Sequence, residues 1–398
     1  MIKEILIASF RSIDEAILEP GRITVLTGAN NSGKSSILYA LQVFKNLVTN
    51  PSRSVDELLN LGFLNLGGLK ECSFMRKGGG FTLRIELEHK SSIKKSSIVK
   101  YEIGIDDQGS YLNIGSTGFY EFKGHIDIAF PYPLNKVRKI TLKSHQGATF
   151  SWNGVNIVEM NKAAEELYFL KDAVELPIYT ITHLEVVPTQ RGFTKPIFNT
   201  VPLNDQIYTE DEVATLLAID KDVQAKVAYY FEKITGKRFS ISIQPGMGFF
   251  YMQVREADGS FSTELVNQGM GMNQIVFLLT KILYGKNRLI CIDEPEIHLH
   301  PSLIEQFVRV LVEIAKKEDK QFIFSTHSEH WLLSLLAEVN DGNLAADDLK
   351  VYYLQKNDQE TSVEQQKVMP NGQLEGGLKN FMESQMRLAE RFFDTTTA

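Results

Sequence analysis

Residues 27–36 read T-G-A-N-N-S-G-K-S-S and fit the pattern G-x-x-x-x-G-K-[ST]. An apolar run at 23–26 precedes this stretch, and a helix-forming run at 37–44 follows it. This order of strand, loop and helix is the setting of a P-loop, whose backbone N–H groups close around the phosphates of a nucleoside triphosphate. Lys34 is expected to reach the β- and γ-phosphate oxygens, and the Ser35 hydroxyl to ligate Mg²⁺. The predicted nucleotide-binding residues are Gly28, Ala29, Asn30, Asn31, Ser32, Gly33, Lys34, Ser35 and Ser36.

A second part of the same site is predicted at 289–295, where L-I-C-I-D-E-P reads as a buried strand that ends in two acids. Asp293 is expected to hold Mg²⁺, usually through water, and Glu294 to accept a proton from the attacking water. Taken alone, such a run also describes an ordinary junction between a strand and a loop. The P-loop in the same chain favours the Walker B interpretation.

Another buried strand ending in polar residues follows at 322–328, F-I-F-S-T-H-S, and a helix that begins at Pro301 separates the two strands. Such a unit is a right-handed βαβ crossover, which brings Asp293, Glu294 and His327 to one rim of a parallel sheet. His327 is therefore predicted to hydrogen-bond the γ-phosphate. A zinc site is not favoured, because no cysteine or further ligand with metal-site spacing accompanies the local histidines, His298, His300, His327 and His330.

The stretch 266–274, V-N-Q-G-M-G-M-N-Q, opens the helical run 275–284. Two glycines and several amide side chains at the start of a helix make an anion-binding nest. The P-loop already cradles one triphosphate. The second nest therefore indicates a site that another subunit completes.

The remaining patterns predict an α/β fold with a β-rich lobe. Strands are expected at 2–9, 22–27, 81–87, 98–105, 176–187 and 350–355, and helices at 158–170 and 378–393. Thr209 and Glu212 form a capping box, and Gly236 can end the helix that follows. The predicted parts are an N-terminal section of the ATPase head (1–71), a β-rich inserted lobe (72–155), a mostly helical segment (156–262), a C-terminal section of the head (263–357) and a terminal strand and amphipathic helix (358–398).

Composition limits the classes of function. With two cysteines in 398 residues and no start shaped like a signal peptide, the chain is expected in the reducing cytoplasm. No apolar run is long enough to span a membrane. The formal net charge is -7, so any contact with DNA must come from a local patch. Lysine-rich stretches at 89–100 and 136–143 are candidates, although lysines beside a hairpin loop more often protect a strand edge.

The order of these motifs resembles the ATP-binding-cassette (ABC) ATPases of the SMC and OLD (overcoming-lysogenisation-defect) type. The match is closest to the short prokaryotic AAA-like members found in phage-defence operons. It rests on the P-loop and on F-R-S (10–12), V-P-T-Q-R (187–191), N-Q-G-M-G-M-N-Q (267–274) and C-I-D-E-P-E-I-H-L-H-P (291–301). The resemblance implies a head that pairs with a second head, as a homodimer or a larger even-numbered assembly, and buries two ATP molecules at the interface.

Carried over residue by residue, the resemblance assigns Walker A to Lys34 and Ser35, and Walker B to Asp293 and Glu294. His327 becomes the switch histidine. The signature that contacts the partner's nucleotide becomes Gly269, Gly271 and Asn273, and the loop that crosses the dimer carries Glu296 and His298. The chain departs from the family pattern in two places. Its signature is not L-S-G-G-Q, and no convincing Q-loop glutamine is found, since Gln42 lies in the P-loop helix and 61–69 offers Asn65.

Two functions follow from the resemblance. In the first, the protein is an ATP-driven switch of antiviral defence that controls a separately encoded nuclease or toxin, because too little sequence after His327 remains for a fused nuclease domain. In the second, it is an SMC-like ATPase that binds DNA in repair or maintenance. The absence of coiled-coil arms and the acidic charge favour the switch. A housekeeping NTPase or kinase would not explain the second nest.

Overall fold

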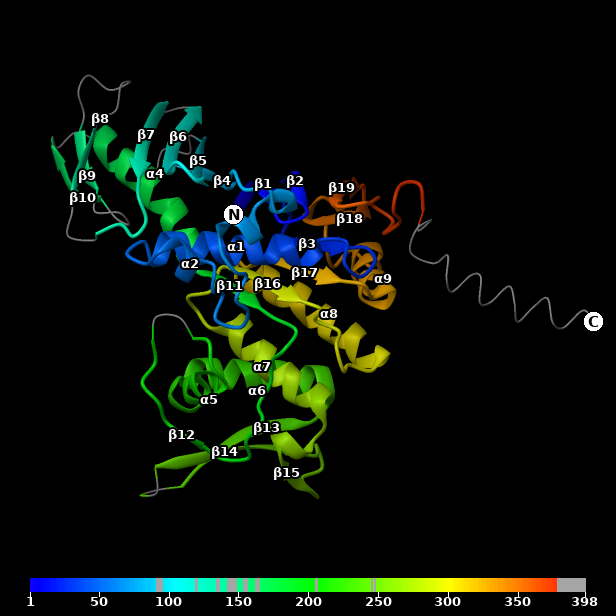
Figure 1. Ribbon diagram of the computed structural model, residues 1–398. Coiled ribbons are helices and arrows are strands. Elements are labelled where there is room, and N and C mark those ends of the chain that lie inside the picture. Colours follow the sequence, from blue (N-terminus) through cyan, green and yellow to red (C-terminus); the bar gives the residue numbers. More distant parts are fainter. Residues whose placement is uncertain are drawn as a thin grey trace, which may run out of the picture.

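The computed structural model describes residues 1–90, 96–118, 121–133, 137–141, 149–152, 157–161, 165–204, 207–244, 246 and 248–377. Figure 1 shows a β-rich lobe above a central sheet, and helices and a small sheet below it. The helix predicted over 378–393 lies outside the described residues. Among those residues, no helix is both long and apolar enough to cross a membrane.

The central sheet is six-stranded, and five of its strands run parallel. Its order is β11 (Leu184–Val187), β16 (Leu289–Asp293), β17 (Gln321–Thr326), β3 (Ile23–Thr27), β18 (Leu349–Asn357) and the antiparallel edge strand β19 (Glu360–Gln366). Every residue of β3, β16 and β17 is buried, as expected for strands covered on both faces. The carboxyl ends of the five parallel strands meet at one edge. This edge carries the candidate site.

The N-terminal strands and the β-rich lobe form one antiparallel sheet. Its order is β2 (Ile13–Leu18), β1 (Ile2–Phe10), β4 (Phe81–Lys90), β5 (Ser96–Ile105), β6 (Ser110–Gly118) and β7 (Phe122–Ile128). The antiparallel pairing predicted for the lobe is confirmed. The lobe extends a sheet that begins at residue 2, because β4 pairs directly with β1. A further small sheet contains β8 (Arg138–Thr141), β9 (Thr149–Trp152) and β10 (Ile157–Asn161).

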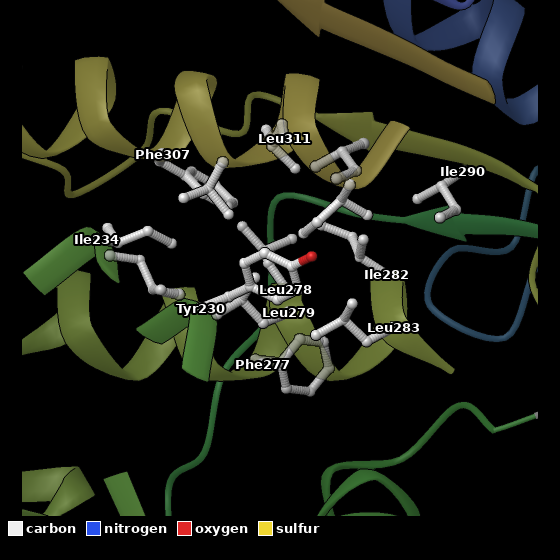
Figure 2. Close-up of a cluster of buried hydrophobic side chains, with 14 of the residues drawn as sticks. Tyr230, Ile234, Phe277, Leu278, Leu279, Ile282, Leu283, Ile290, Phe307 and Leu311 are labelled. Atoms are coloured by element: carbon white, nitrogen blue, oxygen red, sulfur yellow. The ribbon is translucent and has the colours of Figure 1, made fainter. Parts of the chain in front are cut away.

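Helices cover both faces of the central sheet. Between the two large sheets lies the P-loop helix α1 (Lys34–Thr49), with α4 (Glu165–Thr182) packed against it. Short helices α2 (Val55–Leu58), α3 (Leu69–Cys72) and η1 (Phe74–Arg76) follow α1. The opposite side holds α5 (Glu210–Ile219), α6 (Lys221–Thr235), α7 (Met270–Leu283), α8 (Pro301–Lys317) and α9 (Glu329–Asn340). In Figure 2, apolar side chains of α6, α7 and α8 meet Ile290 of β16, so this core anchors the Walker B strand.

The remaining elements lie at the far end of the helical layer. They are β12 (Phe198–Asn199), β13 (Arg238–Ile243), β14 (Phe249–Arg255), β15 (Ser262–Glu264) and the short helix η2 (Leu265–Asn267). The short helix η3 (Ala346–Asp348) lies elsewhere, directly before β18 of the central sheet. The sheet formed by β12 to β15 corrects the expectation of a mostly helical segment over 156–262. Buried residues alternate along β14, and this period of two indicates a strand that the sequence reasoning overlooked.

Two other predictions in this region were wrong. The strand expected over 176–187 is helical up to Thr182, and only β11 is extended. The buried residues Ala173, Val174, Ile178 and Ile181 follow helical spacing, which outweighs the β-branched composition that suggested a strand. The helix expected over 158–170 starts instead as β10, and α4 begins at Glu165. The capping box of Thr209 and Glu212 and the C-cap at Gly236 are confirmed.

Candidate nucleotide site

The P-loop connects the carboxyl end of β3 to the start of α1, as predicted. Gly28 and Gly33 both have positive φ values, 144° and 101°, that favour glycine. A Cβ at Gly28 would lie 2.1 Å from the carbonyl oxygen of Leu354, and one at Gly33 would lie 2.5 Å from the Thr361 hydroxyl. The hairpin of β18 and β19 therefore packs directly on the loop, and both glycines are needed for this approach.

A cavity of about 940 Å³ surrounds the P-loop. Residues 30–36 line one side of it, together with Glu294. The cavity is also lined by Arg11 from the turn after β1, Arg76 from η1 and Lys356 from the end of β18. Cationic side chains beside a P-loop fit an anionic ligand such as a nucleoside triphosphate.

Lys34 is held within the loop. Its Nζ donates to the carbonyl oxygens of Gly28, at 2.9 Å, and Ala29, at 2.8 Å. Burial lowers the pKa of the Lys34 ammonium, and the nearby carboxylates of Glu294 and Asp293 oppose that shift. These contacts keep the ammonium at the loop, where a phosphate can replace the two carbonyl oxygens.

Ser35 and Asp293 converge at the rim of the sheet. The Ser35 hydroxyl donates to Oδ1 of Asp293 across 3.2 Å. Asp293 is buried, and this burial raises the pKa of its carboxyl group. Among the described residues, no cationic side chain forms an ion pair with it at 4.0 Å or less. A buried carboxylate and a hydroxyl that face each other are the hard oxygen ligands that suit Mg²⁺.

Glu294 follows Asp293 with a left-handed backbone, φ 47°. Its N–H donates to the carbonyl oxygen of Ser325 on the neighbouring strand, at 2.7 Å. The Nδ1 atom of His327 lies 2.9 Å from Oε1 of Glu294. The side chain of His327 is half exposed, and that of Glu294 faces the cavity around the P-loop. The prediction that Asp293, Glu294 and His327 lie together at one rim of the sheet is confirmed.

The AAA ATPase domain family matches residues 1–171 and 190–332, which is most of the chain. The chain belongs to this family. It is therefore an ATPase.

Two curated relatives of the ATPase are similar over short stretches. The OLD nuclease of Thermus scotoductus is 31% identical over 133 residues, which cover 31% of this chain and 24% of that protein. Protein ea59 of Escherichia phage lambda is 33% identical over 66 residues, covering 16% of this chain and 13% of ea59. The matches span at most about a quarter of the length of these relatives.

The fold of the ATPase is similar to that of an SMC head. Against the crystal structure of the SmcHead bound to the C-winged helix domain of ScpA, the TM-score is 0.54 at 13% identity. The match covers 92% of this chain and 97% of that one. At this identity the likeness concerns the fold, and it supports the predicted P-loop ABC-type α/β head.

Arg191 belongs to the motif V-P-T-Q-R, but none of its contacts at the site was predicted from the sequence. Arg191 lies four residues beyond the end of β11, at the same rim as the P-loop. Its guanidinium donates to the carbonyl oxygens of Asp293 and Glu294, each at 2.6 Å, and of Pro188, at 2.9 Å. Burial lowers the pKa of Arg191 to about 10, so the side chain stays cationic at neutral pH. The available signal was an arginine in the loop that follows a buried strand.

The same loop also carries a glutamine that was not considered for the Q-loop. Gln190 is exposed beside Arg191. Of the two residues that were considered, Gln42 is buried in α1 and donates to Asn46, while Asn65 accepts from the N–H of Gly67 at the surface. Neither of them lines the cavity around the P-loop.

The predicted signature residues differ in their surroundings. Gly269 has open space around it, and Met270 beside it is 51% exposed. A Cβ at Gly271 would lie 2.8 Å from the carbonyl oxygen of His298 in the same chain. The amide of Asn273 is buried, and it accepts from the N–H of Phe193 and donates to its carbonyl oxygen, both at 2.7 Å. Asn273 is thus engaged inside its own subunit.

The loop predicted to cross the dimer is partly buried. The carboxylate of Glu296 accepts a hydrogen bond from the Thr326 hydroxyl, and burial raises its pKa. His298 is exposed and has a left-handed backbone, φ 62°. Of the two side chains, that of His298 is the one open to solvent.

Behind the site, a buried ion cluster joins α1, β11 and α7. The carboxylate of Glu185 on β11 lies 3.8 Å from Nζ of Lys45 and 2.6 Å from Nζ of Lys281. Lys45 also donates to the carbonyl oxygen of Leu184 at 2.6 Å. Burial lowers the pKa of Lys45, and Glu185 opposes this shift. Glu185 therefore ties the P-loop helix to the helix that carries the predicted signature.

Proposed function

We propose that this ATPase builds its two catalytic sites between paired subunits and acts as a nucleotide-driven switch in antiviral defence. One observation supports the proposal that the sites form between two subunits. Met270 and Gly269, at the start of α7, are open to solvent, and no described residue of 265–274 lines the P-loop cavity of the same chain. An anion-binding helix start that does not face its own P-loop is suited to the nucleotide of a partner.

Within each site, the proposed roles follow the contacts. Lys34 and the backbone of 28–36 bind the β- and γ-phosphates, and Ser35 and Asp293 hold Mg²⁺. When bound, this ion supplies positive charge that stabilises the transferring phosphoryl group. Glu294 orients the attacking water and accepts its proton, and His327 holds the carboxylate of Glu294 and contacts the γ-phosphate. Gly269 and Gly271 contact the partner's nucleotide.

The proposed effector is a nuclease or toxin encoded separately. The similarity to a protein named OLD nuclease supports a link to nucleic-acid cleavage. The match covers about a quarter of that protein's length. The similarity to a phage lambda protein supports a phage context. In this proposal, ATP-dependent pairing of heads holds the effector inactive or releases it.

Light scattering coupled to size exclusion tests the paired sites. The Glu294→Gln variant is measured with and without Mg-ATP, because a hydrolysis-deficient head should accumulate in the ATP-bound state. We expect a shift from monomer to dimer, or to a larger even-numbered assembly, that depends on ATP. A monomer under both conditions would contradict the paired sites and the signature roles of Gly269 and Gly271.

A plating assay tests the switch in defence. The native locus is expressed in a sensitive host with wild-type protein or with Lys34→Ala, and phage plaques are counted. We expect Lys34→Ala to restore plating to the level of an unprotected host. Equal plating on both strains, across a panel of phages that the locus restricts, would remove the role in defence.

A second candidate function, DNA binding of the SMC kind, is favoured by a cavity on the β-rich lobe. This cavity, of about 890 Å³, is lined by Lys100, Lys123, Arg138 and Lys139, although Glu86 and Asp127 also face it. Lys94 and Lys95, which belong to the lysine-rich stretch at 89–100, lie outside the described residues. DNA-stimulated ATP turnover that is lost in Lys123→Glu/Lys139→Glu would favour this function over the switch.

A further inference from the structure

Arg191 binds the backbone of Asp293 and Glu294, the Walker B pair. It follows β11, so it approaches from the side of β16 opposite to β17, the strand that carries Ser325. The peptide after Asp293 and the peptide after Glu294 each offer a carbonyl oxygen to the guanidinium, both at 2.6 Å. Glu294 is a non-glycine residue in the left-handed region, a conformation that persists only when surrounding contacts impose it. Its N–H is fixed by Ser325 and its carbonyl oxygen by Arg191. These two contacts set the direction in which the carboxylate of Glu294 leaves the backbone.

The loop that carries Arg191 is in turn fixed to α7. Two residues after Arg191, both backbone polar groups of Phe193 are bonded to the amide of Asn273. A Cβ on the intervening Gly192, whose φ is 119°, would lie 2.9 Å from Oδ1 of Asn273. Asn273 lies in the first turn of α7, three residues from the exposed Met270. A displacement of this helix start must therefore move the loop at 191–193.

We propose that Arg191 is a positioning residue for Glu294, and that Asn273 couples the start of α7 to it through Phe193. The inference rests on the proposed function, in which Glu294 is the base and the start of α7 meets the partner's nucleotide. Docking of the partner subunit at α7 then positions the Glu294 side chain of the subunit to which that α7 belongs. The path of contacts runs from Asn273 through Phe193 and Arg191 to Glu294.

The chemistry of arginine explains why this position needs it. A planar guanidinium presents several N–H donors in a fixed fork, and here they reach three carbonyl oxygens in different directions. Lysine has one nitrogen on a flexible stem, so Arg191→Lys keeps the charge and loses the simultaneous contacts. The variant therefore separates positioning from simple charge.

The first measurement compares kcat with ATP affinity. In Arg191→Lys we expect kcat to fall about 100-fold, the cost of misplacing a catalytic group by roughly 1 Å. The Kd of a fluorescent ATP analogue should stay within about threefold, because Arg191 does not line the cavity. The matched control is Lys195→Met, on the same loop, whose ammonium pairs with Asp211 at the surface and which should keep wild-type turnover. A purely structural role would lower binding and thermal stability together with kcat.

The variant Asn273→Asp tests the same path of contacts independently, in case Arg191→Lys does not fold. The carboxylate keeps the acceptor for the N–H of Phe193 and loses the donor to its carbonyl oxygen. We expect kcat to fall about 10-fold with unchanged affinity for the analogue. If both variants fold and retain wild-type kcat, the proposal is overturned.

A double-mutant cycle with Glu294→Gln decides whether Arg191 acts through Glu294. Single-turnover hydrolysis over hours, with enzyme in excess, gives the residual rate of Glu294→Gln. Adding Arg191→Lys to that background should change the rate by less than about threefold. A further loss of about 100-fold would show that Arg191 acts independently and would overturn the inference alone. If Glu294→Gln retains wild-type turnover, the proposed role of Glu294 fails, and the inference fails with it.

Discussion

Nδ1 of His327 lies 2.9 Å from Oε1 of Glu294, and the two residues follow the ends of adjacent parallel strands, β17 and β16. The register pairs Asp293 with Ser325, so the residues that follow are brought together by the sheet itself. A histidine at this distance restricts the rotation of the carboxylate. The pair is thus positioned by two neighbouring strands of the central parallel sheet.

Replacing Glu294 by Gln should lower kcat by about 10²- to 10⁴-fold, because the amide cannot accept a proton from water. ATP should still bind, since the phosphate contacts come from the P-loop. A filter-binding measurement of ATP and a phosphate-release assay separate the two effects. The control is Glu305→Gln, an exposed acid paired with His330 away from the site, which should keep its turnover. Equal rates for both variants would exclude Glu294 as the base.

Replacing Met270 by Glu should abolish ATP-dependent pairing in the Glu294→Gln background. Met270 is exposed at the start of α7. In the proposed pairing, a carboxylate there would face the γ-phosphate of the partner's nucleotide. Gly271 is a poorer choice, because any side chain would first meet His298 of its own chain. Light scattering with Mg-ATP gives the mass, and unchanged thermal stability checks the fold. Pairing that survives Met270→Glu would place the interface elsewhere.

Replacing Glu185 by Gln should destabilise the protein by roughly 3–5 kcal/mol, because Lys45 and Lys281 would be left buried without their carboxylate. Urea unfolding followed by circular dichroism measures the change in free energy of unfolding. The control is Glu175→Gln on α4, whose pair with Lys171 is at the surface and should be worth less than about 1 kcal/mol. A similar small change in both variants would mean that the buried cluster contributes little.

Lys320 should make stability depend on pH in the alkaline range. Burial lowers the pKa of Lys320 from 10.5 to about 8, and its ammonium donates to the carbonyl oxygens of Tyr284 and Asn287. Between these two values the unfolded chain binds more protons than the folded one, so the free energy of unfolding attributable to this group rises with pH. The full rise is roughly 3 kcal/mol.

The measurement compares urea unfolding of the wild type and of Lys320→Met at several pH values from 7.5 to 10.5. Loss of the two hydrogen bonds in the variant shifts its stability by an amount that does not depend on pH. The difference between the two curves therefore reports the titration of Lys320. Parallel curves would show that the ammonium is not destabilised by burial.

The sequence predicted the parts of the site that local chemistry specifies. The P-loop pattern and the apolar strands that end at Asp293 and Thr326 predicted which residues meet at the edge of the sheet. Glycine patterns and buried parallel strands are easily recognised in a sequence. Arg191 and the internal role of Asn273 were missed, since both depend on contacts between residues 80 or more positions apart. The helix at 176–182 was missed because its β-branched residues favour strands, and the packing of α4 overrides that preference.

The hairpin that packs on the P-loop has a consequence for biosynthesis. Gly33 approaches Thr361, whose N–H donates to the carbonyl oxygen of Ser12 and whose hydroxyl lies 2.8 Å from that of Ser12. The ribosome makes the P-loop more than 300 residues before the hairpin that supports it. At a synthesis rate of about 5–20 residues per second, the loop waits on the order of tens of seconds for this contact. A nascent chain should therefore gain full affinity for ATP only after the hairpin of β18 and β19 has been made.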